Sequence, residues 1–272
     1  MSSQADKIKA INDAWLNINI DESKIINPFS LQTEEEFTTK LTWLMTNPEY
    51  FSFICKELLN IDILPTQALM LKEMWNRKFP MLIASRGFGK SFILSVYAIL
   101  RALLIPGRKI VIVGAAFRQS KVLFEYMDTI WRNSPLLRDI VGGNGGPRRD
   151  VDMCRIKIGD SQVTCLPLGD GSKIRGQRAN DIIADEFASI PRQIFENVVA
   201  GFAAVSASPV ENVRRIAAKK KAIELGELSE DEEEAHEEGA NQIVLSGTAY
   251  YDFNPFAEYW KKWKSFITSQ GD

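Results

Sequence analysis

The sequence predicts an α/β fold with a mainly parallel central sheet and helices on both faces. Three observations lead to this prediction. From Pro65 onward, short apolar runs of strand length alternate with longer runs that have helical spacing. A glycine-rich turn at 84–91 joins one such strand to a helix, and the carboxylate pair Asp185-Glu186 ends another strand. The 272 residues suffice for one large α/β domain or two small ones.

The alternating pattern places six strands and five helices. The expected strands are Met81–Ala84, Lys109–Val113, Cys154–Ile158, Gln162–Leu166, Asp181–Asp185 and Gln242–Ser246. The expected helices are Thr66–Trp75, Ser91–Leu104, Gln119–Trp131, Arg192–Phe202 and Pro255–Phe266. The third and fourth strands are joined by a short Gly-Asp-Ser turn and are predicted to form a hairpin. The glycine-rich stretch 142–147 is interpreted as a flexible connection.

Two regions lie outside this alternation. Residues 1–60 are predicted to form an N-terminal helical region, which either packs on the core or serves a partner. Residues 61–272 then form the core, interrupted at about 207–240 by a basic run followed by an acidic run. Such a block is typical of a solvated, mobile insertion, and the alternative is an arm that contacts a neighbouring subunit.

Composition excludes several classes of function. The only histidine, His236, lies in the acidic run, so neither a histidine-based catalytic triad nor a multi-histidine zinc site is available. Cys55, Cys154 and Cys165 are scattered without metal-ligand spacing and are expected to be buried thiols. No apolar run approaches the roughly 20 residues that span a bilayer. The net charge of −2 argues against bulk attraction to DNA or membranes.

The strongest motif is the phosphate-binding loop Ala84-Ser85-Arg86-Gly87-Phe88-Gly89-Lys90-Ser91. Its two glycines allow backbone N–H groups to turn toward phosphate oxygens, and the helix that follows adds the favourable end of its dipole. The Lys90 ammonium is expected to contact the β- and γ-phosphates, and the Ser91 hydroxyl to coordinate Mg²⁺. The consensus has glycine at the first position, where this chain has Ala84.

The strand 181–185 ends in a carboxylate pair that supplies the second half of a hydrolytic site. Asp185 is expected to hold the Mg²⁺ that Ser91 contacts. Glu186, the next residue, is expected to act as the base or to orient the attacking water. The alternative is an ordinary strand end facing solvent, where carboxylates are common.

Two further segments complete the candidate site. The apolar strand 242–246 ends in Ser246-Gly247-Thr248, whose hydroxyls are placed to sense the γ-phosphate; the alternative is an ordinary turn after a strand. Gln67 precedes the phosphate-binding loop by about twenty residues. Its amide offers a donor and an acceptor side by side, which matches the N6/N7 edge of adenine.

These segments, in this order, resemble the ATPase motor domain of the large terminase subunit of tailed bacteriophages. The resemblance covers roughly residues 60–268, including Lys173-Ile174-Arg175-Gly176-Gln177 before the carboxylate pair and Asn254-Pro255 after the third motif. It implies a RecA-like (ASCE) P-loop NTPase that uses ATP and Mg²⁺. Residues 246–248 then become the coupling motif, Arg86 a P-loop arginine acting in cis, and Arg175 an arginine finger acting on the neighbouring subunit. Arg178 is the nearby competitor for that role.

The resemblance also implies partners. They are double-stranded DNA, the portal of a procapsid, a small terminase subunit and further copies of the chain in a ring, usually of five, although the isolated domain is also expected to exist as a monomer. The place of action is the cytoplasm of an infected bacterial host, transiently at the procapsid portal. A nuclease domain, normally present in the family, is expected to be absent from this chain. Candidate DNA-contacting residues are Arg148, Arg149, the basic run 214–221 and Lys261, Lys262 and Lys264.

Two other functions remain open from the sequence. One is a single RecA-like lobe of a DNA helicase, which would share the Gln, Asp-Glu and Ser-Gly-Thr motifs. The other is an assembly module that binds a nucleotide without hydrolysing it. Strand separation of a forked duplex would support the first. Glu186 and Arg175 argue against the second, and measurements of phosphate release with and without DNA test it.

Overall fold

The computed structural model describes residues 41, 43–45, 47–142, 145–168, 179–195, 241–248 and 254–269. The chain divides into two units, residues 1–44 and 45–272, and nearly all described residues belong to the second unit. No helix in the described part of the chain is long and apolar enough to cross a membrane.

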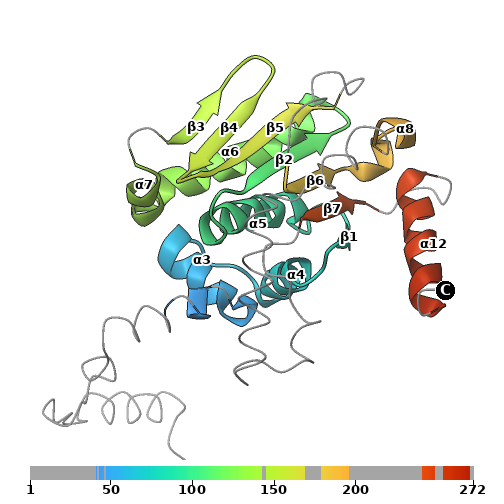
Figure 1. Ribbon diagram of the computed structural model, residues 1–272, viewed down its shortest axis with the longest axis horizontal. Helices are drawn as coiled ribbons and strands as arrows, with labels where there is room; N and C mark the ends of the chain where they lie inside the picture. Colours follow the sequence, from blue (N-terminus) through green and yellow to red (C-terminus); the bar gives the residue numbers. More distant parts are fainter. Residues whose placement is uncertain are drawn as a thin grey trace, which may run out of the picture. The chain divides into compact units, whose positions relative to one another are not determined.

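A seven-stranded sheet forms the centre of the second unit, in the order β1-β7-β6-β2-β5-β4-β3 (Figure 1). The strands are β1 (Met81–Ile83), β2 (Lys109–Gly114), β3 (Gly146–Arg149), β4 (Cys154–Ile158), β5 (Ser161–Pro167), β6 (Asp181–Asp185) and β7 (Gln242–Gly247). The adjacent pairs β1–β7, β7–β6, β6–β2 and β2–β5 are parallel, whereas β5–β4 and β4–β3 are antiparallel. The predicted mainly parallel sheet and the predicted hairpin are both confirmed.

Helices cover both faces of the sheet. One group consists of α3 (Phe51–Leu59), α4 (Pro65–Trp75), α5 (Lys90–Leu104), α6 (Phe117–Asn133) and α7 (Pro135–Val141), with the 3₁₀ helix η2 (Pro48–Tyr50) before them. The elements η3 (Phe187–Ser189), α8 (Arg192–Ile194) and α12 (Pro255–Thr268) contribute to the opposite face.

Alternation along the central strands divides the core between these two faces. Ile110 and Ile112 of β2 pack in the larger cluster with α5 and α6, whereas Val111 and Val113 pack in the smaller cluster, to which Phe256 of α12 belongs. Successive side chains of a strand point to opposite faces, so an apolar strand supplies both clusters.

The structure differs from the sequence predictions at the antiparallel edge and at the N-terminal boundary. Gly146 and Pro147, predicted to lie in a flexible connection, begin strand β3, whose pairing with β4 outweighs the poor strand propensity of its composition. The short helix α7, which begins at Pro135 and is capped by Ser134, was not predicted. The expected boundary near residue 60 falls inside the second unit, because α3 packs its buried face into the larger cluster.

Several predicted elements lie wholly or partly outside the described residues. They include the helical runs before residue 41, the charged insertion 207–240 and most of the helix expected at Arg192–Phe202, of which the structure describes α8.

Candidate active site

The candidate site lies where three neighbouring parallel strands end. The loop 84–89 follows β1, Glu186 follows β6, and Thr248 follows β7, and these strands are adjacent in the order β1-β7-β6 (Figure 1). The pairing of Ile83 with Gly247 and the hydrogen bond from Ala84 N to Gly247 O at 3.3 Å fix the relative positions of the first and third segments. Ligands of such sheets bind beyond the carboxyl ends of the strands.

The phosphate-binding loop turns sharply before helix α5. Gly87 and Gly89 have φ values of +80° and +84°, a left-handed conformation that favours glycine. Gly89 is the N-cap of α5, so Lys90 is its first helical residue. The Lys90 side chain is buried, and its ammonium donates to Ala84 O at 3.0 Å, Ser85 O at 3.1 Å and Thr248 Oγ1 at 3.2 Å. Lys90 therefore joins the loop to the end of β7.

Asp185 at the end of β6 meets the first turn of α5. The Ser91 hydroxyl donates to Asp185 Oδ2 at 3.4 Å, while Oδ1 is buried and has no hydrogen-bond partner among the described residues. Burial raises the pKa of Asp185; the backbone N–H of Glu186, the Ser246 hydroxyl and the positive charge of Lys90 oppose that rise. A buried carboxylate oxygen beside a serine hydroxyl suits a hard cation such as Mg²⁺, which is usually held by one or two carboxylates together with substrate phosphates and water.

Glu186 has an unusual backbone. Its φ of +49° and ψ of +45° place a non-glycine residue in the left-handed region, where it serves as the N-cap of η3. Such conformations cost about 1–3 kcal/mol and cluster at functional sites. The turn directs the chain away from the sheet directly after Asp185, and Glu186 remains partly exposed while Phe187 is fully buried.

Gln67 lies against the phosphate-binding loop. A Cβ added to Gly89 would meet Gln67 Nε2 at 3.0 Å, so the two residues are in contact across α4 and α5. Gln67 Oε1 accepts a hydrogen bond from Leu64 N at 3.0 Å, and this bond caps the start of α4. One carbonyl lone pair of Gln67 is therefore already used within the protein, whereas its amino group faces the loop.

The end of β7 is closely packed. All six residues of β7 are buried, and a Cβ on Gly247 would meet the Phe256 ring at 3.2 Å. The buried Ser246 hydroxyl lies close enough to the Asp185 carboxylate to lower its pKa, although it forms no hydrogen bond of normal geometry among the described residues. The three predicted coupling residues thus lie between the Lys90 ammonium on one side and η3 and α12 on the other.

Comparison with known proteins assigns part of the chain to a family. Residues 81–208 match the family model described as "Terminase large subunit, T4likevirus-type, N-terminal". This segment of the chain belongs to the terminase large-subunit family. The match contains the phosphate-binding loop and the carboxylate pair, whereas Gln67 and residues 246–248 lie outside it.

The fold of the chain is that of phage large terminases. The HK97 bacteriophage large terminase matches with a TM-score of 0.54 and 12% identity, over 84% of this chain and 41% of that chain. The large terminase of the thermophilic bacteriophage D6E matches with a TM-score of 0.50 and 11% identity, over 74% and 43%. This chain therefore spans less than half the length of these two proteins. No curated protein matches the chain.

Some predicted site residues cannot be placed, because they lie outside the described part of the chain. Arg175, its competitor Arg178 and the rest of 173–177 lie outside the described part of the chain, so their roles stay predictions. Ser85, Arg86 and Phe88 lie in the loop and are exposed.

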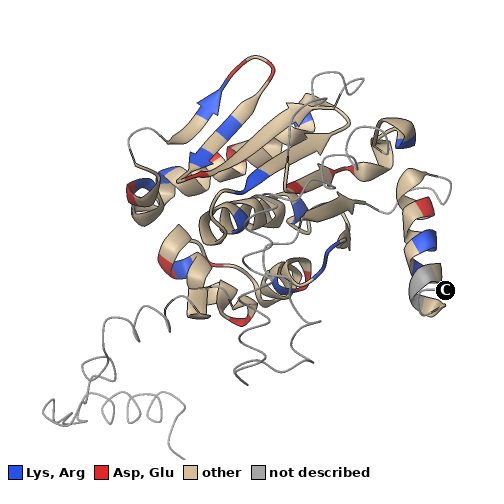
Figure 2. Ribbon diagram, in the orientation of Figure 1, with Lys and Arg blue, Asp and Glu red and all other residues tan. Residues whose placement is uncertain are grey.

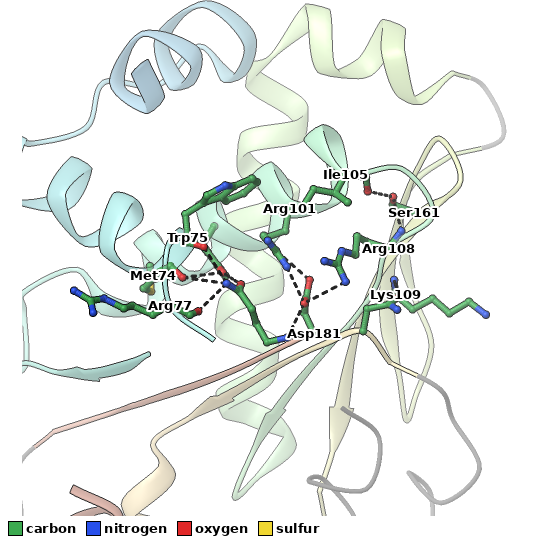
Figure 3. Close-up of polar contacts among 12 residues, drawn as sticks. Met74, Trp75, Arg77, Arg101, Ile105, Arg108, Lys109, Ser161 and Asp181 are labelled. Atoms are coloured by element: carbon green, nitrogen blue, oxygen red, sulfur yellow. Dashed lines mark hydrogen bonds and ion pairs between the residues drawn. The ribbon is translucent and has the colours of Figure 1, made fainter. Parts of the chain in front are cut away.

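The sequence predictions missed a buried polar cluster at the N-terminal ends of β6 and β7, opposite the candidate site (Figure 3). We call it the basal network, and it consists of Tyr97, Arg101, Arg108, Asp181 and Gln242. Arg101 forms a two-pronged ion pair with Asp181, at 3.1 Å from Nε and 3.0 Å from Nη2, and Arg108 Nη1 lies 3.7 Å from the same carboxylate. The bonded partners are 61 or more positions apart in the chain, so only the arginine and aspartate identities could have suggested the cluster.

Lys and Arg lie on β3, β4 and α12, among other elements (Figure 2), and the candidate DNA-contacting residues have different surroundings. Arg149 pairs with the buried Asp128 of α6 and lies over the Phe124 ring, which holds β3 against α6. Its neighbour Arg148 is exposed on the other face of β3, directly opposite Arg155 of β4. The run 214–221 lies outside the described residues.

Proposed function

We propose that this chain is the ATP-hydrolysing motor of a DNA-packaging terminase, and that it couples hydrolysis of Mg-ATP to the movement of double-stranded DNA into a procapsid. The observation that carries this proposal is the convergence of Lys90, Ser91, Asp185 and Thr248 at the ends of three adjacent strands. The family match of residues 81–208 supports the same function.

Lys90 and the loop glycines bind the phosphates in this proposal. In the structure the Lys90 ammonium uses carbonyl oxygens of its own loop and the Thr248 hydroxyl. Phosphate oxygens are stronger acceptors because they are charged, so nucleotide binding would draw the ammonium away from these partners. Thr248 would then lose its bond to Lys90, and this change gives the coupling motif a direct way to sense the phosphates.

Ser91 and Asp185 hold the metal, and Glu186 acts on the attacking water. A bound Mg²⁺ supplies positive charge that neutralises the β- and γ-phosphate oxygens. The left-handed backbone at Glu186 ends the strand that carries Asp185, and Glu186 is partly exposed whereas Asp185 is buried, so the two neighbouring carboxylates can take different roles. Glu186 orients the water and accepts its proton, while Gln67 lies beside the loop where it can contact the adenine.

Arginines and partner molecules complete the proposed motor. Arg86 acts from within the loop, and Arg175 acts on the nucleotide of a neighbouring copy in a ring, since a guanidinium stabilises charge on the transferring phosphoryl group. The ring docks on the portal of a procapsid in the cytoplasm of the infected host and receives double-stranded DNA with the help of a small terminase subunit. These partners follow from the family rather than from contacts within the described residues.

Glu186→Gln provides the test, because it removes the proton acceptor and preserves the size of the side chain. Phosphate release stimulated by double-stranded DNA should fall by roughly 10²–10⁴-fold, while binding of a fluorescent ATP analogue stays unchanged. The matched control is Glu73→Gln on the exposed surface of α4, where an ion pair with Arg77 is the only described partner lost. Its rate should equal that of the wild type.

Two outcomes would contradict the proposal. Equal phosphate release by Glu186→Gln and the wild type would refute the role of Glu186. Strand separation of a forked duplex by the wild type would favour a helicase over a packaging motor.

A further inference from the structure

Four elements that carry predicted site residues also reach the basal network at their other ends. Helix α4 carries Gln67 near its start and Trp75 at its end, and α5 carries Ser91 at its start and Arg101 in its last turns. Strand β6 runs from Asp181 to Asp185, and β7 runs from Gln242 to Gly247. The site thus lies at the C-terminal ends of these strands, and the network lies at their N-terminal ends.

The basal network ties these four elements together through few groups. Gln242 N donates to Asp181 Oδ1 at 3.1 Å, so the two strands share the carboxylate that also pairs with Arg101 of α5. The Gln242 amide donates to Trp75 O at 3.0 Å and to Arg77 O at 2.8 Å, which satisfies carbonyls at the end of α4 (Figure 3).

Side chains of α5 complete the network. Tyr97 donates to Gln242 Oε1, and the Arg101 guanidinium lies 5.0 Å from the centre of the Trp75 ring. Asp181 and Tyr97 are fully buried, and Arg101 and Arg108 nearly so. Helix α5 and strands β6 and β7 therefore contribute members of the buried network, and α4 contacts it through backbone carbonyls at its end and through the Trp75 ring.

Helix α5 and strand β6 span similar distances between the candidate site and the basal network. Ser91 and Arg101 are ten positions apart, or about 15 Å along a helix. Asp181 and Asp185 are four positions apart, or about 13 Å along a strand. Helix α5 runs away from the site while β6 runs toward it, so the Arg101–Asp181 contact and the Ser91–Asp185 contact form together only at one relative position of helix and strand. A slide of one helical turn, about 5.4 Å, would break both.

We infer that the basal network sets the position of α5 along β6, and that Arg101 and Asp181 are positioning residues for the metal-binding pair Ser91 and Asp185. This inference rests on the proposed function, because it assumes that Ser91 and Asp185 hold Mg²⁺. The two-pronged Arg101–Asp181 geometry is directional, since the planar guanidinium fits a carboxylate along two parallel bonds. It therefore resists sliding, which a purely apolar contact between helix and strand would tolerate more readily.

The experiment measures the Mg²⁺ concentration that gives half-maximal tightening of fluorescent ADP binding in the full chain. Arg101→Lys is the lead variant, because it keeps the buried positive charge but loses the two-pronged geometry. Asp181→Asn is the second, because it keeps the shape and removes the charge. Both should raise the Mg²⁺ midpoint roughly tenfold, as loss of a group that orients a metal ligand typically does, while binding of the nucleotide without Mg²⁺ changes little.

Asp128→Asn is the matched control. Asp128 is also buried and paired with two arginines, Arg132 and Arg149, but it joins α6 to β3 and contacts neither α5 nor β6 in the described interactions. This variant should lower the melting temperature and leave the Mg²⁺ midpoint unchanged. All measurements are made well below the melting temperature of each variant, so that a change in the folded fraction cannot shift the midpoint.

A double variant distinguishes positioning of Ser91 by Arg101 from a general loss of stability of the fold. If Arg101 acts through Ser91, the effect of Arg101→Lys on the midpoint should vanish in a Ser91→Ala background. Sites this far apart otherwise give additive effects. Additive effects, or a normal midpoint in a folded Arg101→Lys variant, would overturn the inference.

Asp185→Asn distinguishes failure of the positioning inference from failure of the proposed metal-binding function. A normal Mg²⁺ midpoint in Asp185→Asn would refute the metal-binding role itself. A raised midpoint in Asp185→Asn beside a normal one in Arg101→Lys would refute only the positioning role.

Discussion

Gly89→Ala tests how tightly the phosphate-binding loop is held against α4. The backbone at Gly89 has a φ of +84°, where an L-residue costs about 1–2 kcal/mol. Replacing glycine also reduces the freedom of the unfolded chain, which offsets about 0.4–1 kcal/mol of that cost. The backbone alone should therefore lower the free energy of unfolding by about 1 kcal/mol.

The contact with Gln67 adds a second cost. The new methyl group would lie 3.0 Å from Gln67 Nε2, so the Gln67 side chain must shift by a few tenths of an ångström. That shift disturbs the bond from Leu64 N to Gln67 Oε1, and loss of a helix cap costs about 1 kcal/mol. The total loss expected for Gly89→Ala is about 2 kcal/mol.

Gly87→Ala is the control, because its φ of +80° is similar and nothing lies within 4 Å of the added Cβ. Urea unfolding without nucleotide should give a loss of about 1 kcal/mol for this variant, with an unchanged slope. In a Gln67→Ala background the two glycine variants should cost the same, since the contact is gone. Equal losses in the wild-type background would refute the packing of Gln67 on the loop.

Three further predictions concern other groups. Burial raises the pKa of Asp185 in the folded state, so without Mg²⁺ the folded state favours the protonated carboxyl. The free energy of unfolding should therefore fall as the pH rises from about 3.9 through this raised pKa. Urea unfolding measured over this pH range should show a smaller fall for Asp185→Asn. Thr248→Val removes the hydroxyl that accepts from Lys90, and should lower the melting temperature by roughly 2–4 °C, whereas Thr248→Ser keeps the hydroxyl and should not. A loss in Thr248→Ser without one in Thr248→Val would place the stabilisation in the methyl group instead. Burial raises the pKa of Cys55 to about 12, so a thiol reagent should label it only as fast as the chain unfolds, and rapid labelling of the folded protein would contradict its burial.

Local patterns were sufficient for most of the fold. The apolar runs that became β2, β6 and β7 are continuous and short, and a strand buried on both faces needs such a run wherever it lies in the sheet. The Gly-x-Gly-Lys-Ser turn was recognisable because its requirements are local: left-handed backbone at two positions, then a helix start. Strand β3 was missed because its glycine and proline disfavour a strand, and only its pairing with β4 makes it one.

The sequence by itself predicted which residues bind phosphate and metal, because Lys90 and Ser91 begin the helix after a glycine-rich turn and Asp185 and Glu186 stand at the end of an apolar strand. Only the tertiary structure decided that these segments meet, since the order β1-β7-β6 brings together strand ends that are 62 or more positions apart in the chain. It also decided which residues Gln67 and Asp181 contact. Gln67 reaches Gly89, and Asp181 reaches Arg101 and Gln242, through contacts between elements that are distant in the chain. Such contacts depend on how helices and strands pack, and no periodicity or spacing in the sequence encodes them.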